Sequence, residues 1–167
     1  MFQVGEKVVY PQYGLGIITE VTERVVADKV LNFYRLQFLV RQMEIFVPVQ
    51  RAKENGLRRV MPLDEVNDLV AYVTARVDRV QPQQWHRWRK KTQEQLRTGE
   101  PMDMAGIYVY LSNLEKKKGL SFTERKILIQ VERLLITEVA AAKQISEEEA
   151  EALLLPGKKE AALQAAM

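Results

Sequence analysis

Apolar and polar residues alternate along the first fifty residues of the chain, and this period of two predicts β-strands. Val8–Tyr10 forms a first short apolar run, and a second strand is predicted from Leu15 to Val25. Two more are predicted at 34–40 and 43–49, where apolar residues occupy every second position. Four short strands bury an apolar face only if the sheet bends strongly. We therefore expect a small Tudor-like barrel or a bent open sheet.

The same alternation assigns side chains to the two faces of this sheet. On the fourth strand it separates Glu44 and Phe46 from the apolar set of Met43, Ile45, Val47 and Val49. On the second strand it separates Ile17, Thr19, Val21 and Glu23 from Ile18, Glu20, Thr22 and Arg24. An outward Phe46 beside an outward Arg24 would form a mixed apolar and cationic patch, as in protein interfaces. Packing of Phe46 on the helical part is an equal alternative. Gly14 and Gly16 indicate a bend or a bulge.

Helical spacing replaces this alternation after Pro62. It predicts a first helix from Pro62, a second from about Pro82 to Thr98–Gly99, and a third from about Pro101 to Gly119. Capping boxes at Ser121–Glu124 and Ser146–Glu149 predict the starts of two more helices. The segment from Lys158 to Met167 is either a frayed helix or a tail.

These patterns predict an α+β protein with a β module at 1–55, a linker at 56–61, a compact all-helical domain at 62–155 and a C-terminal tail at 156–167. Strands that precede helices, rather than alternate with them, disfavour a βαβ nucleotide-binding fold. The pair Gly14-Leu15-Gly16 is also too short for the dinucleotide fingerprint.

Composition removes most enzyme chemistry. The 167 residues include no cysteine and a single histidine, His86, so disulfides, thiolate zinc sites and cysteine nucleophiles are excluded. The glutamates at 147–149 suit the first turn of a helix, where acids favour the helix dipole. We expect no catalytic residue, metal, cofactor or small-molecule substrate. The absence of a long apolar run and of a signal peptide predicts a cytoplasmic protein without a membrane partner.

Charge is distributed unevenly along the chain. Residues 1–75 carry 9 basic and 9 acidic side chains, residues 76–133 carry 13 and 7, and residues 134–167 carry 3 and 6. A basic middle segment is typical of a surface that faces a polyanion, but a solvated helix surface fits equally well.

The segment 82–91 holds both tryptophans of the chain, Trp85 and Trp88, interleaved with cations. Cations neutralise phosphates, and an aromatic ring can insert at a base step, so this composition suits nucleic acid. Both rings could instead anchor one helix face on the core. Leu96 follows Trp88 by eight residues, nearly on the same face, so Trp88 is the better core candidate and Trp85 the better exposed one.

Several motifs in one order resemble the CarD family of bacterial transcription regulators. They are Val4-Gly5-Glu6-Lys7-Val8-Val9-Tyr10-Pro11-Gln12-Tyr13-Gly14-Leu15-Gly16, Ile45-Phe46-Val47-Pro48, Gly56-Leu57-Arg58, Trp85 with Arg87 and Lys90, Leu120-Ser121-Phe122-Thr123-Glu124-Arg125-Lys126, and Leu134-Leu135-Ile136-Thr137-Glu138. The resemblance implies a Tudor-like domain that binds the β subunit of bacterial RNA polymerase and a helical domain that contacts promoter DNA. It also implies association with the nucleoid through polymerase.

The resemblance assigns roles to particular residues. It implies that Trp85 wedges at the upstream fork of the transcription bubble, stabilising the open complex, with Arg87 and Lys90 on DNA; Arg89 and Lys91 extend this cationic segment. It implies polymerase contacts on the second and fourth strands, at Arg24, Glu44, Ile45, Phe46, Val47 and Pro48. Two departures stand out. Family members usually have Trp-x-Arg-Arg-Tyr, whereas this chain has Trp85-His86-Arg87-Trp88-Arg89. Phe46 also stands where some relatives have arginine.

Two other functions are compatible with the sequence. An adaptor would bind polymerase or a repair translocase without touching DNA. A free-standing nucleic-acid binder would show salt-sensitive affinity without polymerase, but the β module is neutral and lacks a row of stacking residues. The β module could also bind a partner by adding strand edges together, and proline within 43–47 would disrupt that pairing.

Overall fold

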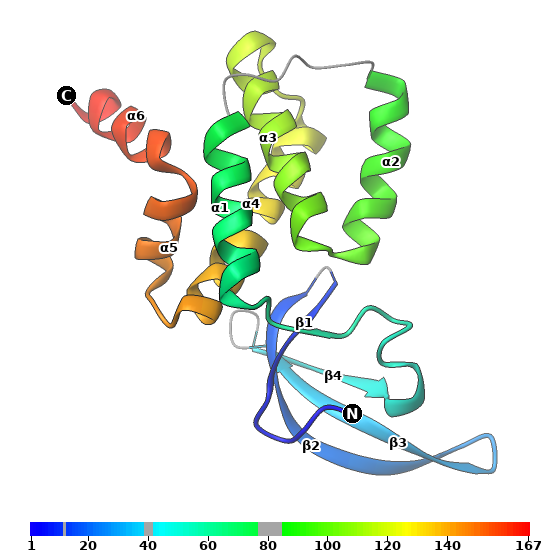
Figure 1. The fold of residues 1–167 in the computed structure, drawn as a ribbon. Helices are drawn as coiled ribbons and strands as arrows, with labels where there is room; N and C mark the ends of the chain where they lie inside the picture. Colours follow the sequence, from blue (N-terminus) through cyan, green and yellow to red (C-terminus); the bar gives the residue numbers. More distant parts are fainter. Residues whose placement is uncertain (12, 39–41, 77–84) are drawn as a thin grey trace. The chain divides into compact units, whose positions relative to one another are not determined.

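A computed structural model describes residues 1–11, 13–38, 42–76 and 85–167, and for 85–89 and 159–163 it describes the backbone only. The chain divides into two units, Met1–Val60 and Met61–Met167. The first contains the strands and the second the helices, as the change of period after Pro62 predicts (Figure 1).

The first unit is an antiparallel sheet in the order β4-β3-β2-β1-β5. Its strands are β1 (Lys7–Tyr10), β2 (Gly14–Val26), β3 (Lys29–Phe38), β4 (Met43–Pro48) and β5 (Arg58–Arg59), with a short 3-10 helix at Val49–Arg51. The first, second and fourth lie close to the predicted strands, whereas β3 begins five residues before the predicted 34–40, and 39–40 lie outside the described residues. The prediction of a linker at 56–61 missed β5, which pairs with β1, because two residues are too few to show alternation.

The core of this unit lies on one face of the bent sheet. Its buried apolar residues are Val8, Ile18, Tyr34, Leu36, Phe38, Val47, Ala52 and Leu57. Gly16 allows the strands to approach closely here, because a Cβ at this position would lie 2.9 Å from Cε1 of Phe38 and 3.2 Å from the carbonyl oxygen of Gln37. The predicted need for glycine at this bend is therefore confirmed.

The second unit is helical. Its helices are α1 (Leu63–Arg76), α2 (Trp85–Thr98), α3 (Pro101–Lys118), α4 (Phe122–Lys143), α5 (Glu147–Leu154) and α6 (Pro156–Ala166). Both predicted capping boxes are present, with Ser121 and Ser146 accepting backbone N–H groups. Gly99 follows α2 with a φ of 68°, as expected of a helix-ending glycine. The last segment, for which helix and tail were both open, is helical.

A single apolar core joins α1, α3, α4 and α5 around fully buried residues such as Leu69, Leu111 and Val131. The chain enters this unit at Met61, whose backbone N–H donates to Oε1 of the buried Glu138 at 3.1 Å. Helix α2 packs on α3, and its buried Thr92 and half-buried Leu96 mark the packed side.

Candidate functional site

The outer face of the sheet carries charged and aromatic side chains from β2, β3 and β4. Residues directly opposite on antiparallel strands project from the same face. Arg35 on β3 lies opposite Glu20 on β2 and Phe46 on β4, so these three form a row across the sheet. Their sequence neighbours Tyr34, Leu36 and Val47 point the other way, into the core.

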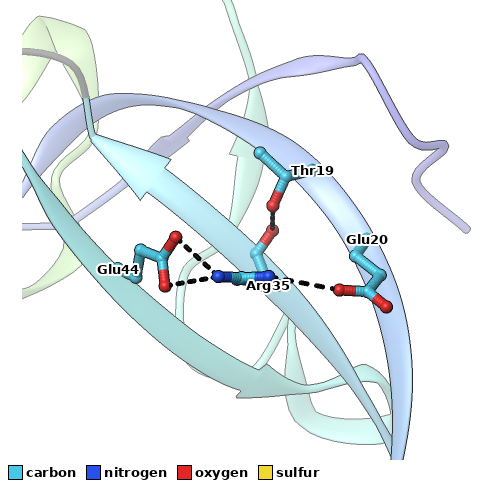
Figure 2. Close-up of polar contacts among 4 residues, drawn as sticks. All are labelled: Thr19, Glu20, Arg35 and Glu44. Atoms are coloured by element: carbon cyan, nitrogen blue, oxygen red, sulfur yellow. Dashed lines mark hydrogen bonds and ion pairs between the residues drawn. The ribbon is translucent and has the colours of Figure 1, made fainter.

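A β-bulge at Thr19 makes this row possible. Ile18 pairs with Leu36, but Glu20 pairs with Arg35, so Thr19 is an extra residue on β2. The predicted alternation along β2 is therefore wrong across this point: Ile17 shares the outer face with Glu20 and Arg24. Without the bulge, burial of Ile18 would carry Glu20 and Arg24 to the core face as well. The hydroxyl of Thr19 donates to the carbonyl oxygen of Arg35 at 3.2 Å, closing the bulge (Figure 2).

Arg24 and Phe46 meet on this outer face. The guanidinium carbon of Arg24 lies 3.6 Å from the centre of the Phe46 ring. Of the two alternatives that the sequence left equal for Phe46, this contact matches the one that places it beside Arg24. Phe46 is half-buried and Arg24 is exposed. An exposed contact of this kind contributes about 0.5–1 kcal/mol, so it orients Arg24 more than it stabilises the unit.

A second arginine on the same face, Arg35, binds two carboxylates. Its Nη2 donates to both carboxylate oxygens of Glu44 at 2.9 Å, and its Nη1 donates to Oε2 of Glu20 at 3.4 Å (Figure 2). The hydrogen bonds to Glu44, and then the negative charge of Glu44, raise the pKa of Arg35. All three side chains are substantially exposed, and exposed ion pairs add little to stability. The ion pairs of Arg35 therefore matter mainly because they fix where the charges of Glu20, Arg35 and Glu44 lie on the surface.

The other predicted contact residues of β4 differ in accessibility. Glu44 is exposed and Pro48 is half-buried on the outer face, so their side chains are available to a partner, whereas the half-buried Ile45 packs against the core. Val47 is only 1% exposed and belongs to the core, so the prediction that its side chain contacts a partner is wrong. Alternation explains this, because Val47 lies between the outward Phe46 and Pro48. As β4 is an edge strand, Val47 could still take part through its backbone.

Sequence reasoning missed Arg35. Its place between the apolar Tyr34 and Leu36 marks it as outward-facing, and that signal is visible in the sequence. Its partners are not, because they depend on the pairing of three strands and on the bulge at Thr19.

The predicted DNA-contacting segment coincides with the start of α2. The side chains of Trp85, Arg87 and Arg89 lie outside the described residues, as does that of Trp88, so the rotation of this helix end stays a prediction. Lys90 and Lys91 are exposed, as expected for residues facing a polyanion. Neither makes an ion pair with another residue that the structure describes. Arg97, later on the helix, pairs with Glu94 at 2.6 Å and is thereby partly neutralised.

No group of three histidine, cysteine, aspartate or glutamate side chains in the described ranges is arranged to hold a metal ion. No helix among the described residues is long and apolar enough to cross a bilayer.

Comparison with known proteins covers both units. Residues 2–61 match the family model of the CarD-like/TRCF RID domain, and residues 69–155 match that of the CarD C-terminal domain. The "Putative transcription factor YdeB" of Bacillus subtilis (strain 168) is 26% identical over 150 residues, which span 89% of this chain and 97% of that protein. The solution structure of the N-terminal domain of Myxococcus xanthus CarD is 25% identical and matches with a TM-score of 0.32, covering 35% of this chain and 79% of that one.

The match to the C-terminal model spans more than half of the chain, and the match to the RID model accounts for the strands that precede it. The chain belongs to the CarD family, which is associated with interaction with RNA polymerase and with the regulation of transcription.

Proposed function

We propose that this protein regulates transcription initiation by binding the β subunit of RNA polymerase and stabilising the promoter open complex. The N-terminal unit Met1–Val60, which we call the barrel, binds polymerase through the sheet face that carries Arg24 and Phe46. The helical unit contacts promoter DNA at the upstream edge of the bubble through the first turns of α2. No catalytic step is involved.

The observation that carries this proposal is the contact between Arg24 and Phe46 on an exposed sheet face, in a chain of the CarD family. A large apolar ring beside a cation is the composition that distinguishes protein interfaces from ordinary surface. Glu44 and Pro48 continue this face along the edge strand β4. The contact surface is therefore apolar at Phe46, cationic at Arg24 and bounded by a strand edge.

The helical unit would act on the DNA equilibrium by differential binding. A protein shifts the equilibrium between closed and open promoter only as far as it binds one of these two states more tightly than the other. Lys90 and Lys91 neutralise phosphates in both states. A ring of Trp85 inserted at the fork would contact melted DNA alone, because only there is a base step already unstacked. Trp85 thus supplies the preference, and the lysines supply affinity.

The test measures the lifetime of open complexes on a slowly melting promoter, with saturating wild-type protein or Trp85→Ala. The variant is expected to shorten the lifetime while polymerase binding stays unchanged. Gln93→Ala, at an exposed position of the same helix, is the matched control and should behave as wild type. A lifetime unaffected by Trp85→Ala would contradict the proposal. Protein that binds polymerase yet gives no protection at the upstream edge of the bubble would indicate an adaptor.

A further inference from the structure

Arg24 shares its sheet face with two carboxylates that could pair with it. Glu20 lies four residues away on the same face of β2, and Glu44 lies two residues from Phe46 on β4. Residues two apart on a strand are separated by about 7 Å, so Glu44 is a neighbour of Phe46, on whose ring the guanidinium of Arg24 lies. Glu23, the sequence neighbour of Arg24, projects from the opposite face.

Arg24 nonetheless pairs with neither of them. Its contact is the ring of Phe46, and the part of the chain that the structure describes offers it no ion pair. Both carboxylates are engaged by Arg35, Glu44 through both of its oxygens. Nε of Arg35 is buried and has no hydrogen-bond partner among the described residues, where this guanidinium bonds only through its two outer nitrogens.

We infer that Arg35 is a positioning residue that occupies Glu20 and Glu44 and so leaves the charge of Arg24 on the Phe46 ring, available to a partner. Charge-assisted hydrogen bonds between a guanidinium and a carboxylate can compete with an exposed cation–π contact. If Arg35 is removed, Glu44 therefore takes Arg24 from the ring and neutralises it. Of these two arginines and two glutamates, only Arg24 then lacks an ion pair with another residue that the structure describes.

The first test observes Arg24 directly and needs no partner. Protons of a side chain stacked on an aromatic ring are shifted upfield in NMR spectra. In the full-length protein, we expect this shift for the δ protons of Arg24, its loss in Arg35→Met, and its return in Arg35→Met/Glu20→Gln/Glu44→Gln. Arg76, which lies 4.2 Å over the ring of Tyr72 in the helical unit, is the internal control and should not change in any variant.

The second test uses affinity for the isolated β subunit, and this part rests on the proposed function. Arg24→Gln and Arg35→Met are each expected to weaken binding by about tenfold. The Arg24→Gln/Arg35→Met double variant should be no weaker than either single variant, because both remove the same charge from the interface. In the Glu20→Gln/Glu44→Gln background, Arg35→Met should cost no further affinity, because no carboxylate is left there to take Arg24 from the Phe46 ring.

These experiments distinguish failure of the positioning role of Arg35 from failure of the proposed binding to the β subunit. Retention of the Arg24 shift in Arg35→Met, or failure of the triple variant to restore it, overturns the role of Arg35. So does wild-type affinity of Arg35→Met in a protein whose Arg24→Gln variant binds weakly. Failure of the wild-type protein to bind the β subunit overturns the proposed function instead, and leaves the result of the NMR experiment standing. Thermal unfolding of each variant checks that the barrel stays folded.

Discussion

The two units present their candidate surfaces in different ways. In the barrel, adjacent residues of one strand serve the core and the outer face in turn: Tyr34, Leu36 and Val47 are buried while Arg35 and Phe46 face outward. In the helical unit, the exposed Lys90 and Lys91 follow one another on α2, which packs on α3 through Thr92 and Leu96. The barrel surface therefore depends on strand register, whereas the cationic surface depends on local helix geometry. A substitution that damages the barrel core should therefore disrupt the barrel's binding face. A substitution that damages the helical core should disturb the cationic surface of α2 less.

Core truncations give the largest expected effects. Leu36→Ala and Leu111→Ala each remove a fully buried side chain and should each cost about 2–5 kcal/mol of the free energy of unfolding. The barrel core has eight buried apolar residues among those described and the helical core nineteen, so Leu36→Ala should unfold its unit first. Urea denaturation followed by NMR methyl signals measures both. If the Arg24–Phe46 contact persists in Leu36→Ala, the binding face of the barrel does not depend on its core, contrary to the comparison above.

The close approach at Gly16 gives the next effect. Gly16→Ala places a Cβ against the Phe38 ring and the Gln37 carbonyl, and we expect a loss of about 1–3 kcal/mol from overpacking. Gly157→Ala, where a Cβ meets nothing within 4 Å, is the control in the helical unit. Chemical denaturation measures the midpoint of unfolding of both variants, and that of Gly16→Ala should be the lower. Equal midpoints would show that β2 can move from β3 without cost, contrary to a register-dependent face.

Helix caps test the local geometry of the helical unit. Ser121→Ala removes the oxygen that accepts the backbone N–H of Glu124 and should cost about 1 kcal/mol, within a range of about 0.5–2. Ser146→Ala removes the same interaction from the shorter helix α5. Because α4 contributes more buried residues to the core, we expect only the Ser121 variant to lower the melting temperature of the whole unit. Similar effects from both would show that the two caps are equally coupled to the core.

The smallest effect is a pH dependence of the barrel. The carboxylate of Glu6 accepts the backbone N–H of Gln3 and Nε of Arg59, which lowers the pKa of Glu6 below its usual value. A depressed folded-state pKa contributes stability that is present above the unfolded-state pKa of about 4.5 and is lost as pH falls through the folded value. Wild-type protein should therefore lose melting temperature between pH 5 and pH 3 more steeply than Glu6→Gln, by roughly a few degrees at most. Parallel curves would exclude this linkage.

The elements of both units could be predicted from the sequence because each has a local cause. Alternation indicates β1 to β4, and Ser121 with Glu124 indicates the start of α4. The contact of Arg24 with Phe46 was one of two alternatives that the sequence left equal, and the alternation assumed along β2 was wrong before Thr19. The outward position assumed for Arg24 was nevertheless right, because Arg24 lies beyond the bulge, where the assumed face is correct.

The remaining features depend on interactions between distant residues. A bulge at Thr19 arises because Ile18 is needed in the core while Glu20 is not, and this conflict appears only when β2 is paired with β3. Strand β5 needs β1 beside it to be recognised. The bond network of Arg35 needs three strands in register. Pairing across a sheet is non-local, so the periodicity of one strand does not by itself show which residues of its neighbours it meets.

The central claim is that the outer sheet face holding Arg24 is the polymerase-binding surface, and the most direct test is the affinity of full-length variants for the isolated β subunit. Arg24→Gln should weaken binding about tenfold, a change of about 1.4 kcal/mol. Glu23→Gln, one residue away on the opposite face of β2, should leave affinity within about twofold of wild type, as expected of a residue outside an interface. Equal affinities of the two variants, or a greater loss in Glu23→Gln, would contradict the account.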